Sequence, residues 1–183
     1  MEKINLSDLN HIDLKGKVIV FPTDTVYGLG GLLNDREAIK KIYEIKGRDL
    51  SKPLAVLTGS IDIDKYVKNI NRATYDLMNK SWPGAVTLIF DKTAEIPDFV
   101  TSGFKTVAFR MPDDKIAQAI LVRFGPMATT SVNLSGNAPL NNIEDIEKQF
   151  MDKIDYLVLD KSISSNAPSH IYDARGNNLK KIR

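Results

Sequence analysis

Cysteine is absent from this sequence of 183 residues. Disulfide bonds, thiolate zinc sites and a thiol nucleophile are therefore excluded. Histidine is scarce, and the two histidines, His11 and His170, lie far apart in the sequence without the local spacing of metal ligands. We therefore expect no metal ion to be held by protein side chains alone.

Long apolar runs are absent as well. No run approaches the ~18 residues that a membrane helix needs. The first stretch, MEKINLSDLNHIDLKGK, mixes charges throughout and lacks the apolar core of a signal peptide. We therefore expect a cytoplasmic protein that does not associate with a membrane.

The excess of one charge over the other is small. Lys and Arg total 25 against 23 for Asp and Glu, which gives a net charge of +2. Such a mildly basic balance indicates a nucleic-acid surface only where the cations cluster. The length and the 43% apolar content are typical of one globular domain with a substantial core.

The familiar phosphate loops and nucleophile motifs are missing. In GLGGLL, Leu33 stands where G-x-G-x-x-G requires its third glycine, and no G-x-x-x-x-G-K-[ST] loop occurs. No serine lies in a G-x-S-x-G elbow, although the sequence leaves a Ser-His-Asp arrangement open. An enzyme with this sequence would show no obvious protein nucleophile.

Helix-like and strand-like stretches alternate along the chain, without repeats or linkers. Apolar, β-branched and aromatic residues predict strands over residues 17–22, 53–57, 85–90, 105–112, 126–136, 154–160 and 168–173. Apolar spacing and capping residues predict helices over residues 34–46, 61–70, 71–80, 113–125 and 142–152. Asn34, with Glu37 three residues on, would cap the first helix. This order predicts one α/β domain with a mixed sheet.

The stretch FPTDTVYGLGG combines hydroxyl side chains with glycines. On an extended chain Thr23, Thr25 and Tyr27 share one face. The glycines that follow would let the backbone turn sharply or approach a ligand closely. The alternative interpretation is a strand with a polar outer face that ends in a loop.

Cations bracket a predicted helix end in KGRDLSKP. A lysine at position 46 is favoured there by the helix dipole alone, worth ~0.3–1 kcal/mol. The functional alternative is a polyphosphate clamp of Lys46, Arg48 and Lys52, since Arg binds phosphate bidentately and Lys supplies a compact charge.

Two further strands carry polar groups on one face. In TVAFR, Thr106 and Arg110 share a face, and Arg110 requires an anion or carboxylate unless it reaches water at the strand end. In GPMATTSVNLSG, alternate hydroxyl and amide side chains suit ribose, phosphate oxygens or an adenine edge. These side chains are those of Thr129, Ser131, Asn133 and Ser135. An edge strand with a solvated face is the alternative for the second stretch.

In this order and spacing, the motifs resemble the YrdC family, the L-threonylcarbamoyladenylate synthases. The matching segments are PTDTVYGLG, IKGRDLSKPL, WPGAVTLIF, TVAFRMP, GPMATTSVNLSG and, more loosely, PSHIYD with a terminal Arg. They run from Phe21 to Arg183 and cover nearly the whole chain. The resemblance implies a single YrdC-like domain over residues 1–183, without the second C-terminal domain of longer relatives.

The resemblance implies a twisted mixed sheet flanked by helices around a concave, positively charged cavity. It further implies that L-threonine, bicarbonate or CO2, and ATP with Mg2+ react to threonylcarbamoyl-AMP and pyrophosphate. Downstream threonylcarbamoyl-transferase enzymes would then modify an adenosine of certain tRNAs, and direct tRNA contact is part of this expectation.

Site residues follow from the matching positions. The catalytic pair would be Lys46 and Arg48. The ATP-binding set implied by the resemblance is Lys46, Arg48, Lys52, Thr106, Ser131, Asn133 and Arg183. The threonine-binding set implied by it is Thr23, Arg110, Thr129 and Ser169.

The sequence departs from the family at two places. Family members commonly have Ser-Thr where this chain has Ser169-His170, and often a His where Leu57 stands. Two other functions fit parts of the pattern. One is a non-catalytic module that binds structured RNA through the same basic cavity, with strongly salt-dependent affinity. The other is a carbamoyl-AMP-forming unit like that of hydrogenase-maturation proteins, which are longer and carry Cys-rich zinc modules.

Overall fold

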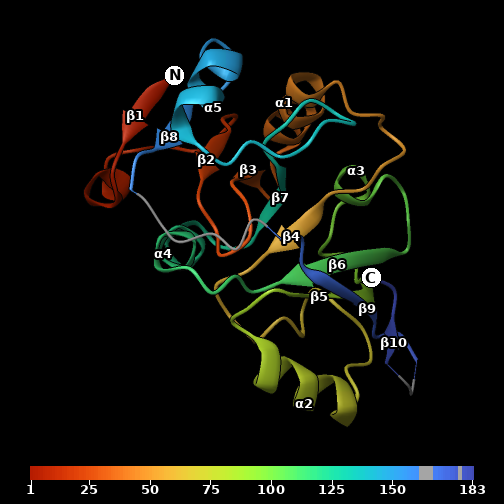
Figure 1. Cartoon of the computed structure of the whole chain (residues 1–183). Helices are drawn as coiled ribbons and strands as arrows, with labels where there is room; N and C mark the ends of the chain where they lie inside the picture. Colours follow the sequence, from red (N-terminus) through yellow and green to blue (C-terminus); the bar gives the residue numbers. More distant parts are fainter. Residues whose placement is uncertain (161–166, 177–178) are drawn as a thin grey trace.

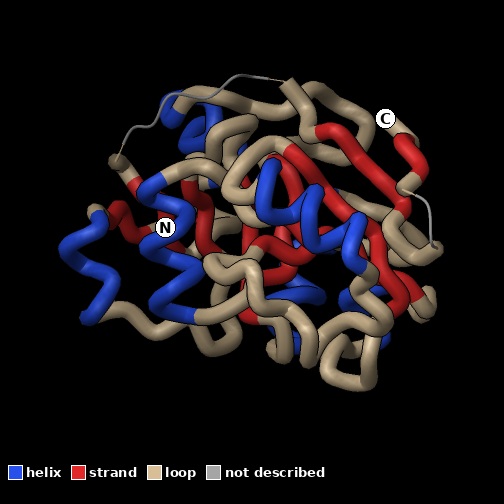
Figure 2. Tube along the Cα trace, turned by 90° about the horizontal axis from the view of Figure 1, so that it is seen from below, coloured by secondary structure: helices blue, strands red, loops and turns tan. Residues whose placement is uncertain are grey.

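The computed structural model describes residues 1–160, 167–176 and 179–183, and over these residues the chain forms a mixed sheet with helices on both faces (Figures 1 and 2). The strands are β1 (Glu2–Ile4), β2 (Ile19–Phe21), β3 (Gly28–Leu32), β4 (Ala55–Leu57), β5 (Val86–Asp91), β6 (Thr106–Arg110), β7 (Met127–Ser131), β8 (Tyr156–Val158), β9 (His170–Asp173) and β10 (Lys180–Lys181). The helices are a 3-10 turn (Leu6–Asn10), α1 (Arg36–Lys46), α2 (Arg72–Ser81), α3 (Asp98–Thr101), α4 (Lys115–Phe124) and α5 (Ile143–Phe150). The predicted α/β class is confirmed.

The strands of the described residues follow the order β1-β8-β2-β3-β7-β4-β6-β5-β9-β10. β4 and β6 are parallel, whereas β7 runs antiparallel to both β3 and β4. This arrangement brings the C-terminal end of β7 beside the N-terminal end of β4, although the two segments lie far apart in the sequence. Among the described residues, no helix is both long and apolar enough to cross a membrane.

Both faces of the sheet are buried at its centre, which explains the unbroken apolar run of β2. Val20 joins the core cluster that includes α1, α2 and α5. Its neighbours Ile19 and Phe21 face the opposite way and join the cluster beneath α4. Because successive residues of a strand point to opposite faces, a strand covered on both sides has no polar position to alternate with.

Two helix predictions were wrong. Residues 61–70 form turns, because Val67 makes a β-bridge to Lys92 and the Lys68 amide donates to the Asp91 carbonyl at 2.8 Å. Backbone N–H and C=O groups that would hydrogen-bond to one another in a helix thus bond to the sheet instead. The cap of α1 is Asp35, whose side chain accepts from the Ala38 amide, and not the predicted Asn34. The short β1 and the 3-10 turn were not predicted at all.

The glycines of the opening motif do not form the turn that the sequence suggested. Residues 22–27 make the turn, and Gly28–Leu32 form β3. A Cβ at Gly28 would lie 3.0 Å from the Thr129 Cγ2 atom, and one at Gly30 3.2 Å from the Phe21 ring. The glycines are therefore required for close packing against neighbouring side chains, and not for a change in chain direction.

Gly31 permits the close approach of α1 to the sheet. A Cβ at this position would lie only 2.8 Å from the Ala38 Cβ. We expect Gly31→Ala to lower the free energy of unfolding by about 1–3 kcal/mol, because overpacking forces the helix away from the strand. Urea denaturation measures this change. The matched control is Gly176→Ala, where an added Cβ has no atom within 4 Å; equal stability of the two variants would contradict the explanation.

Candidate functional site

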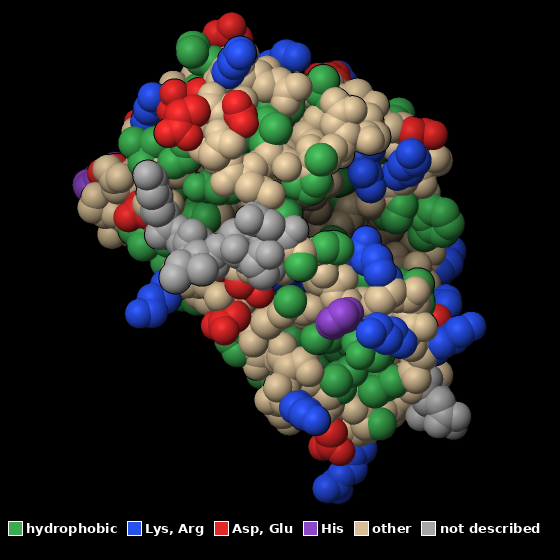
Figure 3. All heavy atoms as spheres, in the orientation of Figure 1, with side chains coloured by type: hydrophobic (Ala, Val, Ile, Leu, Met, Phe, Trp, Pro, Cys, Tyr) green, Lys and Arg blue, Asp and Glu red, His purple; other side chains and the backbone are tan. Residues whose placement is uncertain are grey.

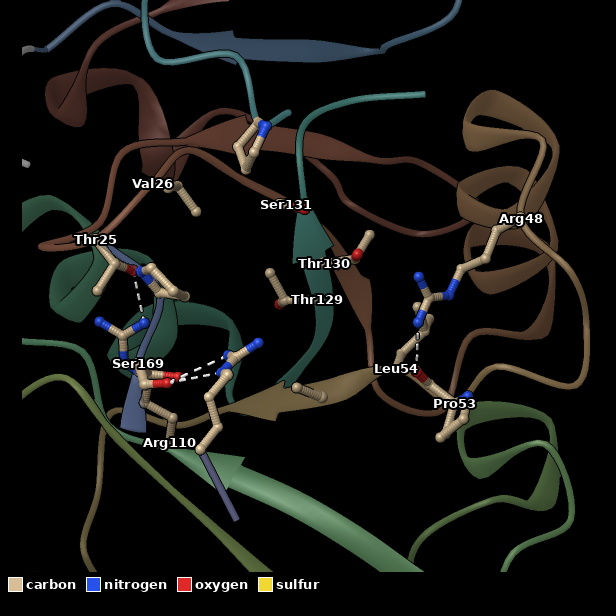
Figure 4. A pocket seen from close by; sticks show the side chains of 14 residues that line it. Thr25, Val26, Arg48, Pro53, Leu54, Arg110, Thr129, Thr130, Ser131 and Ser169 are labelled. Carbon is tan, nitrogen blue, oxygen red and sulfur yellow. Dashed lines mark hydrogen bonds between the residues drawn. The ribbon is translucent and has the colours of Figure 1, made fainter. Parts of the chain in front are cut away.

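A cavity of about 500 Å³ opens over the ends of β4, β6 and β7. The hollow is visible in Figure 3, and Figure 4 shows the side chains that line it. The lining residues are Thr25, Val26, Arg48, Pro53, Leu54, Ala55, Arg110, Thr129, Thr130, Ser131, Pro139, Pro168, Ser169 and Arg183. These described residues include three arginines and no Asp or Glu, so the wall itself favours an anionic ligand.

The floor of the cavity is the part of one sheet face that α4 leaves uncovered. Thr129 and its partner Ala55 point to the same face as Met127 and its partner Leu57, because each pair is two residues from the other. Met127 and Leu57 pack beneath α4. The strands continue beyond the helix, and their hydroxyl-bearing residues remain open to a ligand.

A smaller cavity of about 130 Å³ adjoins the first. The two share eight residues, and the smaller one adds Thr23, Tyr27, Gly28, Leu57 and Thr87. The Thr23 hydroxyl lies 3.1 Å from that of Thr25 and donates to the Val26 carbonyl at 2.7 Å. The site therefore has a large compartment with arginines and a small compartment with hydroxyl groups.

Arg110 is a buried cation at the boundary of the two compartments, with 7% of its surface exposed. Its guanidinium forms an ion pair with Asp24, donates to the Thr25 hydroxyl at 2.7 Å and donates to the Gly84 carbonyl at 3.0 Å. Burial lowers its pKa, and the Asp24 charge opposes that shift. The sequence predicts that the Arg110 guanidinium either meets an anion or reaches water. In the structure it meets an anion, the carboxylate of Asp24.

Lys46 lies behind the cavity wall. Its ammonium donates to the Ser131 carbonyl at 2.6 Å, the Asn133 carbonyl at 2.9 Å and the Asn133 Oδ1 atom at 2.6 Å. These three acceptors match the three N–H groups of a protonated lysine. Only 2% of the residue is exposed, so in this conformation Lys46 fastens the segment after β7 to the end of α1.

The Lys46 ammonium is a buried charge without a carboxylate partner among the described residues. Burial, and after it the nearby Arg48 charge, lower the pKa of Lys46 from 10.5 to about 8. The unfolded chain then binds more protons than the folded chain between these two values, so this group makes stability rise with pH there. We expect the difference in unfolding free energy between wild type and Lys46→Met to increase from about pH 8 to about pH 10. A flat difference would contradict the lowered pKa.

Arg48 reaches the cavity from the side opposite Arg110 and Ser169 (Figure 4). The chain turns at Gly47, which has a left-handed φ of 56° and ends α1. The Arg48 guanidinium then donates to the Lys52 carbonyl at 3.1 Å and the Pro53 carbonyl at 2.9 Å. These bonds hold the side chain across the loop, where its remaining N–H groups face the cavity.

The hydroxyl groups and the terminal arginine complete the wall. Ser169 and Thr87 share a hydrogen bond of 2.8 Å between their hydroxyls. Arg183 donates to the Ser169 carbonyl at 3.2 and 3.3 Å, which joins the tail to the site. The Ser131 hydroxyl donates to Asn133 Oδ1 at 2.8 Å, and the same oxygen accepts a hydrogen bond from the Lys46 ammonium.

Most of the predicted site residues converge. The larger cavity is lined by Arg48, Arg110, Thr129, Ser131, Ser169 and Arg183, and the smaller one also by Thr23. Lys46 and Asn133 lie directly behind Ser131. Lys52 is exposed, and neither it nor Thr106 lines either cavity. Thr106 lies at the opposite end of β6 from Arg110.

Thr25, Thr87 and Thr130 also line the site, although none of them belongs to the predicted ATP-binding or threonine-binding set. Alternation along the strand placed Thr130 on the other face from Thr129, yet both border the cavity at the end of β7. A signal for Thr25 was present, since it shares a face with Thr23. No signal in the sequence marks Thr87, whose contact with Ser169 joins residues 82 positions apart.

Among the described residues, no three His, Cys, Asp or Glu side chains lie close enough together to hold a metal ion. The carboxylate of Asp24 contacts the wall at Arg110 and is paired with its guanidinium. The donor set is therefore suited to anions, and a cation would have to bring ligands of its own.

The family model of Sua5, YciO and YrdC, described as "Telomere recombination", matches residues 12–183. The chain belongs to the Sua5/YciO/YrdC family. This membership confirms the resemblance that the order of the motifs suggested.

Several relatives within this family are similar over most of the chain. It is 35% identical over 146 residues to the threonylcarbamoyl-AMP synthase of Pyrococcus abyssi, covering 79% of this chain and 43% of the relative. It is 31% identical over 166 residues to the threonylcarbamoyl-AMP synthase of Vibrio campbellii, covering 87% and 89%. The chain therefore spans less than half the length of the first relative and most of the second.

The fold is similar to that of P. abyssi Sua5 complexed with L-threonine. The TM-score is 0.91 at 30% identity, and the match covers 100% of this chain and 55% of that one. Over the residues that the structure describes, the chain thus has the Sua5/YciO/YrdC domain fold, a mixed sheet flanked by helices.

Proposed function

We propose that this protein is an L-threonylcarbamoyladenylate synthase, which forms threonylcarbamoyl-AMP and pyrophosphate from L-threonine, bicarbonate or CO2, and ATP. The observation that carries this proposal is the two-compartment cavity, with Arg48 and Arg183 on the larger compartment and Arg110 at the junction with the smaller one. The relatives named threonylcarbamoyl-AMP synthase support it, as does the similar Sua5 structure with L-threonine.

The reaction requires no protein nucleophile. The threonine amine adds to CO2 and loses a proton, giving a carbamate. A carbamate oxygen then attacks the α-phosphorus of ATP, the bond to the β-phosphate oxygen breaks, and pyrophosphate leaves with the electron pair. Such a step is accelerated by alignment of the reactants and by cations at the leaving group. The cavity offers arginines and hydroxyl groups, which match these needs.

The two compartments suggest where each substrate lies. The triphosphate would extend along the larger compartment toward Arg48, with Lys46 adding positive charge from behind the wall and Lys52 from the exposed loop. Arg183, on the Ser169 side of the cavity, would contact the rest of the nucleotide. Ser131 would contact the nucleotide at the end of β7. Asn133 and Thr106 stay predicted nucleotide contacts, although neither of them lines a cavity. A 500 Å³ cavity is within the range of small-molecule sites.

Threonine would occupy the smaller compartment. Its carboxylate would approach Arg110, whose guanidinium is already oriented by Asp24 and Gly84. The hydroxyls of Thr23, Thr129 and Ser169 would surround the threonine side chain and carbamate. Mg2+ would be held by the ATP phosphates and neutralise their charge, as is usual for Mg2+ at nucleotides. The side chains of this site supply the rest of the positive charge.

Release of pyrophosphate tests this proposal. We expect release only when ATP, threonine and bicarbonate are all present. Lys46→Ala and Arg48→Ala should each abolish it, whereas Arg72→Ala, an exposed arginine at the start of α2, should not. Pyrophosphate release without threonine would contradict the reaction, and full activity of Arg48→Ala would contradict the phosphate assignment.

The product would be consumed by transferases that modify a tRNA adenosine in the cytoplasm. A non-catalytic RNA-binding module would instead bind tRNA with strong salt dependence. It would give no calorimetric heat with ATP plus threonine. Titration with ATP, with threonine and with both separates the two functions, because the synthase should bind the pair more tightly than either alone.

A further inference from the structure

A second concave site lies apart from the cavity and shares no lining residue with it. This recess has a volume of about 400 Å³ and is formed where β5 ends, α3 begins and β6 starts. Its lining residues are Lys68, Lys92, Thr93, Ala94, Ile96, Pro97, Asp98 and Lys105. Since the cavity lies at the Arg110 end of β6, the two sites are separated by the length of that strand, about 13 Å.

Three lysines converge on this recess through backbone contacts. The Lys92 amide donates to the Lys105 carbonyl at 2.9 Å, and the Lys68 amide donates to the Asp91 carbonyl at 2.8 Å. Val67 makes a β-bridge to Lys92. Residues that lie 13 and 24 positions from Lys92 in the sequence are thus brought beside it by the sheet.

One of the three ammonium groups is buried and satisfied. The Lys92 side chain is 8% exposed, donates to the Ile96 carbonyl at 2.7 Å and forms an ion pair with Asp98 at 2.6 Å. Lys68 and Lys105 are exposed and form no ion pair among the described residues. The Lys105 charge nevertheless acts on Asp98, because it helps to lower the pKa of that carboxyl after the Lys92 hydrogen bond.

The charges of the recess define the ligand that fits it. The Lys92 charge is neutralised by Asp98, so two uncompensated positive charges remain, those of Lys68 and Lys105. A carboxylate would neutralise only one of them, whereas a phosphate group carries about −1.5 to −2 at pH 7. Lysine ammonium groups bind phosphate as compact point charges with three donors each.

We propose that Lys68 and Lys105, supported by Lys92, form a second binding site for a phosphate group. The phosphate could come from two sources with the same chemistry, free phosphate or pyrophosphate and the backbone of a nucleic acid. The site lies outside the proposed reaction and does not depend on it.

Residue-resolved binding tests the site on the full chain. Sodium pyrophosphate is titrated into 15N-labelled protein, and the amide signals of Thr93 and Lys105 report on the recess while those of Thr129 and Ser131 report on the cavity. We expect Lys68→Gln/Lys105→Gln to weaken the response at the recess by about tenfold or more and to leave the response at the cavity unchanged, since two ammonium contacts are lost only at the recess. The matched control is Lys115→Gln/Lys148→Gln, which removes the same charge from exposed helix positions.

A second arm separates the two sources. tRNA binding is measured at several salt concentrations for wild type and both double variants. If backbone phosphates occupy the recess, the salt slope falls by about 1.4–1.8 in Lys68→Gln/Lys105→Gln and much less in the control. A recess that responds to pyrophosphate without a change in this slope identifies free phosphate as the ligand. If both double variants behave alike in both arms, the proposed site is refuted.

Discussion

Arg110→Met is expected to lower kcat/KM for threonine by about 30- to 4,000-fold, the equivalent of about 2–5 kcal/mol for truncating one partner of a buried, hydrogen-bonded charge pair. The guanidinium that would receive the threonine carboxylate is lost, while Arg48 and Arg183 remain in the larger compartment. ATP affinity should therefore change much less than threonine affinity. Calorimetric titration of each substrate, combined with pyrophosphate release, measures the difference.

The same substitution leaves the partly buried carboxylate of Asp24 without its partner, which destabilises a protein by up to about 3–5 kcal/mol when the remaining charge is fully buried. The double variant Asp24→Asn/Arg110→Met removes this charge and should recover much of the stability without recovering threonine use. Arg110→Lys keeps the charge but loses the planar fork, so we expect an intermediate loss of threonine affinity. Unchanged threonine kinetics in the folded double variant would exclude Arg110 as the carboxylate ligand.

The second large effect is expected at the other side of the cavity. Arg48→Gln should weaken ATP binding by about 10- to 100-fold, because charge-assisted bonds to phosphate contribute about 1.5–3 kcal/mol. Threonine binding alone should change little, since Arg48 does not line the smaller compartment. The loss of ATP affinity should become smaller as the salt concentration rises, because dissolved ions screen a guanidinium that is accessible to solvent.

Lys52 provides an informative comparison within the same motif. It is exposed and lines neither cavity, so Lys52→Gln should weaken ATP binding less than Arg48→Gln does. Arg72→Gln removes an exposed arginine elsewhere and serves as the control for a change in net charge. Equal losses at positions 48 and 52 would show that the phosphates lie outside the cavity, over the loop surface.

Much of the fold could be predicted because local patterns and tertiary packing agree. Helices α2, α4 and α5 have a capping side chain at the first turn and an apolar stripe that faces a core cluster. The helix predicted over residues 61–70 failed because the sheet offered its backbone better partners, as at Val67 and Lys92. Tertiary hydrogen bonds override local propensity where a segment lies along a strand.

The glycines show the same limit in another form. The sequence indicates that Gly28 and Gly30 need a special environment, but it cannot tell a turn from a close contact. The tertiary structure shows that close contact is the reason, because a Cβ atom added at either glycine would lie within 3.2 Å of Thr129 or Phe21. Such a neighbour is invisible in the sequence when it lies about a hundred positions away.

Types and order of residues were sufficient to determine the α/β class, the family and the chemical character of the site, since apolar periodicity, caps and motif spacing are local properties of the chain. The partners of the charged groups depended on the folded structure. Only there does Arg110 meet Asp24, does Lys46 fasten the segment after β7, and do Lys68 and Lys105 come together. Electrostatic interactions act over distances of a few Å in space and are insensitive to separation along the chain, so strand pairing, and not sequence spacing, decides which charges interact.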